Sequence, residues 1–172
     1  MSTDQIQKSI ILKASRARAW RAISDAAEFG LWFGVSFDGP FVPGSRITGR
    51  IVPTRVDPEV ARLQEPHAGK PFEFTVESIE PGERIVFRWH PFAIDPAVDY
   101  SGEPATRIVF ELRDEPGGVR LTITESGFDQ IPLARRADAF RANDGGWAHQ
   151  VQLLARYLAM PEGALAPAAA AR

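Results

Sequence analysis

Six segments of the chain alternate between apolar and polar residues, the pattern of a strand with one buried face. In one of them, Phe72, Phe74 and Val76 share one phase, while Glu73 and Glu77 share the other. Two connections between neighbouring strands are short and contain proline and glycine, so we expect a largely antiparallel sheet. The strands are predicted at Ile6–Lys13, Arg46–Val52, Phe72–Ile79, Arg84–His90, Thr106–Arg113 and Val119–Ser126.

Helical periodicity occurs in three places. Ser15 is positioned to cap a first helix that runs to about Ser24, because its hydroxyl can accept from a backbone N–H of the first turn. A second helical turn with clustered aromatic residues follows at about Ala26–Phe33. The strongest signal predicts a helix from about Pro132 to Ala159. Its apolar stripe is expected at Leu133, Ala137, Phe140, Asp144, Trp147, Val151, Leu154 and Leu158.

The order of these elements predicts an α+β domain. A strand and two short helices are followed by antiparallel strands with one dry face, and then by one long helix with one apolar stripe, which must pack on that face. A curved sheet around a helix leaves a wedge between them, which we expect to be an apolar, ligand-sized cavity. The two long connections, Pro53–Pro71 and Pro91–Pro104, are expected to shape its mouth as binding loops.

Several short segments, in this order, resemble a known family. Together the matches extend from about Ile6 to Leu158. The segments are Ala19-Trp20-Arg21-Ala22-Ile23-Ser24-Asp25, Phe29-Gly30-Leu31-Trp32-Phe33, Glu125-Ser126-Gly127-Phe128 and Asn143-Asp144-Gly145-Gly146-Trp147. They are similar to the family named for activators of the heat-shock protein 90 ATPase (AHSA-like), within the START-like SRPBCC superfamily.

The resemblance implies a helix-grip, birch-pollen-allergen-like fold, with a curved antiparallel sheet wrapped around the long C-terminal helix. It implies a single domain over residues 1–160, and the alanine-rich residues 161–172 are expected to be a disordered tail. In the eukaryotic co-chaperones a separate N-terminal domain contributes to ATPase activation, so that activity is not carried over to this chain. The family offers no fixed catalytic motif to transfer.

Composition and charge exclude several classes of protein. Among 172 residues, 20 are basic and 22 acidic, which gives a net charge of −2 and no basic surface for nucleic acid or anionic lipid. The chain has no cysteine, so disulfides and thiolate chemistry are absent. No apolar run approaches the ~20 residues of a membrane span. With no signal-peptide pattern at the N-terminus, we expect a soluble, cytoplasmic protein.

Motifs for common chemistries are also missing. His67, His90 and His149 lie far apart in the sequence and without metal-ligand spacing, so no metal is expected. His90 is the histidine nearest the expected cavity mouth, although a solvated position is the preferred interpretation. Neither a G-x-S-x-G elbow nor a nucleotide-binding glycine motif occurs. We therefore expect no cofactor and assign no catalytic residue.

Nine residues are predicted to line the cavity. They share an inward strand phase, the helix stripe or the aromatic cluster, although ordinary core packing explains such aromatics equally well. The candidates are Trp32, Phe37, Phe74, Phe87, Trp89, Phe110, Glu125, Trp147 and Val151.

Two acidic residues have alternative interpretations. Glu125 continues the inward phase of its strand and would be a buried carboxylate that serves a ligand. The preferred interpretation is that the strand ends just before it, so that Glu125 reaches solvent. Asp144 either faces the cavity or, as preferred, caps a helix that restarts at Gly145. The pair Arg135-Arg136 is interpreted as a solvated helix face.

The leading functional hypothesis is a binding protein for a hydrophobic or aromatic small molecule. A second is an enzyme of the cyclase, aromatase or hydrolase kind that uses Glu125 or His90 as acid or base, although a non-enzyme is favoured. A third is a chaperone-associated interaction module. A homodimer is left open.

Overall fold

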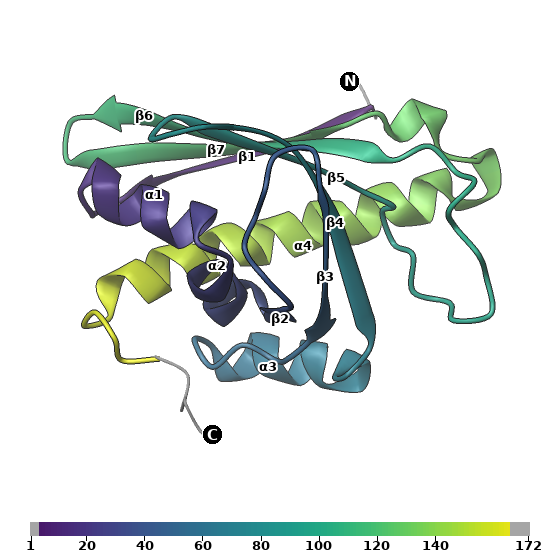
Figure 1. Cartoon of the computed structure of the whole chain (residues 1–172), viewed down its shortest axis with the longest axis horizontal. Helices are drawn as coiled ribbons and strands as arrows, with labels where there is room; N and C mark the ends of the chain where they lie inside the picture. The colour runs from purple at the N-terminus through teal and green to yellow at the C-terminus, as the bar shows by residue number, and fades with distance from the viewer. Residues whose placement is uncertain (1–3, 166–172) are drawn as a thin grey trace.

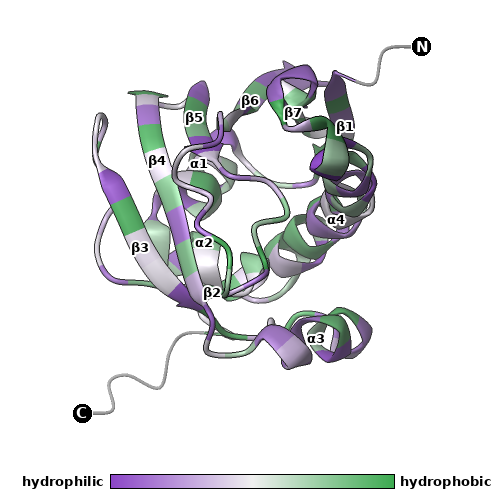
Figure 2. Ribbon diagram, turned by 90° about the vertical axis from the view of Figure 1, so that its right-hand side faces the viewer, coloured by the Kyte–Doolittle hydropathy of each residue, from purple (hydrophilic) through white to green (hydrophobic). Residues whose placement is uncertain are grey.

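The computed structural model describes residues 4–165 and confirms the predicted helix-grip fold. Its strands form one seven-stranded antiparallel sheet in the order β1-β7-β6-β5-β4-β3-β2. The sheet curves over a long helix, α4, which runs across its concave side (Figure 1). Seen from the side, the strands from β3 to β1 form an arc, and α4 lies beside β1 at one end of it (Figure 2). Helices α1 and α2 lie inside this arc.

Six of the strands coincide with the predicted segments to within two residues at each end. The seventh, β2, was missed because it has only three residues, too few to show alternation. It begins directly after Gly34, whose φ of 101° ends the preceding helix in the left-handed conformation that glycine adopts freely. The strands are β1 (Gln5–Leu12), β2 (Val35–Phe37), β3 (Arg46–Ile51), β4 (Pro71–Glu80), β5 (Arg84–Trp89), β6 (Thr106–Glu115) and β7 (Gly118–Ser126).

The two short helices begin at side-chain caps. Ser15 accepts a hydrogen bond from the backbone N–H of Arg18 and starts α1 (Arg16–Ser24), as predicted. Asp25 accepts in the same way from Glu28 and starts α2 (Ala26–Phe33). The two helices cover one end of the concave face of the sheet (Figure 1).

The long connection Pro53–Pro71 contains helical structure, which the sequence pattern did not predict. It contains α3 (Pro58–Gln64), whose N-cap is Asp57, and a single 3₁₀ turn at Glu65–His67. A proline at the first helical position fits that start, since its missing N–H would have no partner there. The sequence pattern predicts a binding loop here and not a helix, because the seven residues of α3 are too few for a clear apolar stripe.

The C-terminal helix α4 (Leu133–Ala159) is continuous through Gly145 and Gly146. Asp144 therefore caps no helix: its side chain is 49% exposed and forms an ion pair with Lys8 on β1 at 2.9 Å. The predicted stripe is wrong at Leu133, which is 78% exposed, and at the exposed Ala137, whereas Phe140 does pack against the core. The buried residues of α4 are Ala139, Trp147, Val151, Leu153, Leu154 and Tyr157.

The two faces of the sheet are as predicted, one dry and one wet. On the inner face, Phe74, Phe87 and Phe110 are fully buried. On the outer face, Glu77 of β4 accepts hydrogen bonds from the neighbouring guanidinium groups of Arg88 and Arg107. The main core therefore lies between the sheet and the helices.

The loop 91–104 is held to α4 by Arg135. Its guanidinium donates to the carboxylate of Glu103 and to the backbone carbonyls of Pro91 and Phe92, and it lies 4.7 Å from the ring centre of Tyr100. Only 20% of the Arg135 side chain is exposed. The interpretation of this arginine as part of a solvated face was therefore wrong, because its partners lie on a loop remote in sequence.

Only the first part of the predicted tail, residues 161–165, lies within the described residues. Leu165 is only 8% exposed, and its carbonyl accepts a hydrogen bond from Arg55. The rest of the tail, 166–172, lies outside the described residues. Within residues 4–165 no helix is both long and apolar enough to cross a membrane.

Candidate functional site

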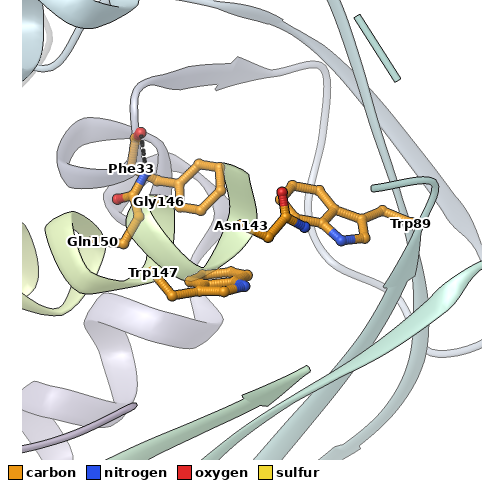
Figure 3. Close-up of a pocket in the computed structure, with 6 residues that line it drawn as sticks. All are labelled: Phe33, Trp89, Asn143, Gly146, Trp147 and Gln150. Carbon is orange, nitrogen blue, oxygen red and sulfur yellow. Dashed lines mark hydrogen bonds between the residues drawn. The ribbon is translucent and has the colours of Figure 1, made fainter. Parts of the chain in front are cut away.

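A small pocket lies where the end of α2, the end of β5 and the middle of α4 meet. Three aromatic rings and the polar side chains of α4 form its walls (Figure 3). Its volume is about 70 Å³. The lining residues are Phe33, Trp89, Asn143, Gly146, Trp147 and Gln150.

The pocket extends from the surface toward the core. Phe33 and Trp147 are 6% and 2% exposed and form its inner end. The other four lining residues are half-buried, so they form the part that is open to solvent. A ligand entering here would place its leading group against two buried aromatic rings.

Behind the pocket wall lies a fully buried carboxylate, that of Glu125. The indole N–H of Trp147 donates to Oε1 at 2.7 Å, and that of Trp89 donates to Oε2 at 2.6 Å. The hydroxyl of Thr106 also donates to Oε2, at 2.5 Å. The amide of Asn143 donates to Oε1 at 2.9 Å and lies 3.1 Å from Oε2. Three of the six pocket-lining residues, Trp89, Asn143 and Trp147, are therefore anchored by their side chains on one carboxylate.

This arrangement corrects the preferred interpretation of Glu125, which placed it in solvent. The strand continues through it because β7 has a neighbour on each side, with Ile6 of β1 and Ile108 of β6 opposite Glu125. Both of its oxygens are occupied by neutral donors. A buried carboxylate with such a complete set of partners fixes the side chains around it.

Gln150 carries an unused hydrogen-bonding atom. Its Nε2 donates to the backbone carbonyl of Phe33 at 3.1 Å, which fixes the orientation of the amide because a carbonyl only accepts. Its Oε1 is buried and has no hydrogen-bond partner among the described residues. A buried acceptor without a partner is costly, so a ligand or water that donates to it would be stabilised there.

The rest of the predicted wedge is filled by side chains. Phe29 of α2 lies at its centre, with ring-centre distances of 5.6–6.0 Å to Phe74, Phe87 and Phe110. Phe74 and Phe87 stack at 4.4 Å. Drug-sized ligands occupy pockets of about 300–1,000 Å³. The pocket beside Glu125 is much smaller, because these rings occupy the space that the sequence assigned to a ligand.

The structure separates the nine predicted cavity residues into two groups. Trp89 and Trp147 line the pocket, and Glu125 anchors both. Trp32 is core: it is fully buried and donates its indole N–H to the carbonyl of Ala22. The other five belong to the packed interior or its edge: Phe37, Phe74, Phe87, Phe110 and Val151.

The remaining ionisable candidates lie apart from this pocket. His90 is half-buried, with Nε2 at 3.0 Å from the backbone carbonyl of Glu103. His67 lies 3.2 Å from the amine of Lys70. The described part of the chain contains no cluster of three or more histidine and acidic side chains able to hold a metal.

Four pocket residues were missed by the sequence reasoning: Phe33, Asn143, Gly146 and Gln150. A signal for two of them was present, since Asn143 and Gln150 flank Trp147 at i−4 and i+3 on one helix face. Their polarity excluded them from an apolar stripe. They are turned inward because Glu125 and the carbonyl of Phe33 accept their N–H groups.

A second, larger hollow of about 250 Å³ lies between α1, α2 and the end of α4. At its wall, the carboxylate of Glu28 accepts from Arg18, Arg21 and the hydroxyl of Tyr157. Burial alone would raise the pKa of Glu28, but the hydrogen bonds from Tyr157 and Arg21 and the charge of Arg18 hold it below its usual value. Burial, together with the bond to Glu28, raises the pKa of Tyr157. The cluster joins the three helices.

Many solved structures resemble the chain, and three of them illustrate the similarity. DynU16, a protein in the dynemicin biosynthetic locus, is 22% identical with a TM-score of 0.63, and the match covers 91% of this chain but only 48% of DynU16. Protein CV1439 from Chromobacterium violaceum is 18% identical with a TM-score of 0.65, over 93% of this chain and all of that one. The Aha1 dimer from Colwellia psychrerythraea is 19% identical with a TM-score of 0.65, over 92% and 98% of the two chains.

These similarities indicate that the chain shares the fold of the three solved structures. A comparison with curated proteins gave no match. A family model matches residues 13–159, which include α1 to α4 and six of the seven strands. The predicted family is thereby confirmed. The chain belongs to the family described as activator of Hsp90 ATPase homolog 1-like protein.

Proposed function

We propose that this protein binds a small molecule through the pocket between α2, β5 and α4. The observation that carries the proposal is the anchoring of both pocket indoles, Trp89 and Trp147, on the buried carboxylate of Glu125. Binding sites of this kind combine apolar walls with a few fixed polar groups. Gln150 also lines the pocket, and its buried Oε1 has no hydrogen-bond partner among the described residues.

The pocket also limits the size of the ligand. At about 70 Å³ it accepts a small molecule or one end of a larger one. Because the four half-buried lining residues face the surface, the remainder of a larger ligand would lie outside the pocket. The ligand we propose is therefore smaller, or less deeply bound, than one filling the whole wedge between sheet and helix.

The same geometry favours binding over catalysis. Glu125 is buried, as a tuned acid or base would be, but both of its oxygens already accept hydrogen bonds. His90 is engaged with the carbonyl of Glu103. Neither group offers a free atom toward the pocket, so the enzyme alternative gains no support from these two residues.

Native mass spectrometry of the freshly purified protein, followed by a thermal-shift screen of small aromatic and aliphatic molecules, tests the proposal. We expect a ligand either to be retained through purification or to be found in the screen. Its binding should weaken in the variant Trp89→Phe. The control variant Trp20→Phe should bind it normally, since Trp20 lies on α1 away from the pocket. Absence of any ligand in both experiments would contradict the proposal. The same spectra report the oligomeric state and so test whether the chain forms the homodimer that the sequence leaves open.

A further inference from the structure

Within residues 4–165, the buried carboxylate of Glu125 has no positively charged partner. Its donors are two indoles, one hydroxyl and one amide, all of them neutral. Every ion pair found within residues 4–165 involves other carboxylates, such as Lys8 with Asp144 or Arg135 with Glu103. A carboxylate surrounded by neutral dipoles leaves a negative potential in its low-dielectric surroundings. The pocket lies directly on the other side of its donors.

The pocket walls add to this potential. The rings of Phe33, Trp89 and Trp147 converge, with ring-centre distances of 5.7, 6.1 and 6.5 Å between them. The face of an aromatic ring is negative and attracts cations. Because both indoles donate their N–H to a carboxylate, they are polarised so that electron density shifts into the rings. The spacing is too short for a group between the rings, so a cation would sit over their open side.

The polar atoms left to the pocket are acceptors. Asn143 directs its amide nitrogen at Glu125, which leaves its Oδ1 for other partners. Gln150 directs its amide nitrogen at the carbonyl of Phe33, and its Oε1 has no hydrogen-bond partner within residues 4–165. The indole N–H groups of Trp89 and Trp147 are occupied as well. With its donors engaged, the pocket disfavours anions and favours a positively charged group or a hydrogen-bond donor.

We infer that the pocket binds a small organic cation, the alkylated ammonium group of a larger molecule. The inference rests on the proposed function and names its ligand class. The volume of about 70 Å³ is far below the roughly 300–1,000 Å³ of pockets for drug-sized ligands, so the pocket suits a compact methylated ammonium group rather than a fused ring system. A bare metal ion does not suit the site, since the oxygens of Glu125 are occupied by N–H and O–H donors.

Choline and 3,3-dimethyl-1-butanol test the inference on the unmodified protein. The two probes have the same shape, but the alcohol carries a neutral carbon in place of the charged nitrogen. Titrations followed by calorimetry and tryptophan fluorescence should show choline bound about tenfold more tightly, from the cation–aromatic attraction and the buried charge. Equal or tighter binding of the alcohol would overturn the inference and leave the proposed function standing. If neither probe binds but a neutral molecule from the screen does, the inference of a cation fails and the proposed function stands. If no molecule binds at all, the inference and the proposed function both fail.

A pair of variants locates the source of the preference. Glu125→Gln removes the buried charge, and we expect the preference for choline to fall at least about fivefold. Asp144→Asn removes a charge next to Asn143 in the sequence, but one that is 49% exposed and paired with Lys8, so the preference should be retained. Equal loss in both variants would contradict a role for Glu125. If Glu125→Gln does not fold, the comparison of the two probes on the unmodified protein still decides.

Discussion

Replacing Glu125 by alanine removes the acceptor shared by four side chains from β5, β6 and α4. Two of these donors are fully buried, the indole N–H of Trp147 at 2% exposure and the hydroxyl of Thr106 at 0%. The other two, on Trp89 and Asn143, are half-buried and can turn to water. The cost of the substitution therefore comes mainly from the first two.

The magnitude follows from the price of a buried donor without a partner, about 1–3 kcal/mol for each. Two such donors give about 2–6 kcal/mol, and the cavity left by the carboxylate adds to it. Relief of the buried charge offsets part of this. We expect Glu125→Ala to lower the free energy of unfolding by about 3–5 kcal/mol, a large fraction of the 5–15 kcal/mol typical of a domain.

Urea unfolding followed by tryptophan fluorescence and circular dichroism measures this loss, because all four tryptophans remain in the variant. Thr106→Val provides a graded comparison: it removes one donor and leaves the others, so we expect a loss of about 1–2 kcal/mol. A Glu125→Ala variant as stable as the parent protein would refute the account, since it would mean that water or other acceptors satisfy the buried donors equally well.

Three further changes have defined outcomes. Tyr157→Phe removes a donor to Glu28 and should lower the free energy of unfolding by about 1–2 kcal/mol at neutral pH. Because the folded-state pKa of Glu28 is lowered from 4.5, this bond stabilises the protein above that pH, and the difference between the two proteins should vanish as the pH falls through the lowered pKa in acid urea titrations. Arg135→Ala releases the loop 91–104 and should speed its cleavage in limited proteolysis at least severalfold; unchanged cleavage would contradict the anchoring role. Gly145→Ala lies in open space on α4 and should raise the free energy of unfolding by about 0.5–1 kcal/mol in urea, whereas a loss would mean that the helix is distorted there.

The fold was predictable because local signals agreed with one another. Ser15 capped α1, and the phases of the strands defined one dry face that matched a single long helix. The segments that were missed, β2 and α3, are short, and short elements depend on their neighbours rather than on periodicity.

The site was predictable only in part, because its determinants are contacts between distant segments. The strand phase indicated that Glu125 faces inward, but not that four donors from three other segments would satisfy it there. A lone acidic residue near a strand end is usually solvated, so the sequence favoured a solvent-exposed Glu125. Asn143 and Gln150 were overlooked for the same reason: a polar residue is recognised as inward-facing only when its partner is known.

The size of the pocket also depended on side-chain packing. The aromatic residues that suggested a cavity are the same residues that fill it, with Phe29 packed against three rings of the sheet. Periodicity tells which side chains point inward, whereas the volume left over depends on how the rings interlock. Sequence reasoning therefore identified the wall and overestimated the space.

The most direct test of the central claim uses the indole N–H signals of the protein labelled with nitrogen-15. The four tryptophans give four such signals, which single Trp→Phe variants assign. During titration with choline or a screened ligand, the signals of Trp89 and Trp147 should shift together, because their N–H groups lie between the pocket and Glu125. The signals of Trp20 and Trp32 should stay in place. Binding that moved the signals of Trp20 or Trp32 and left those of Trp89 and Trp147 unchanged would contradict the account.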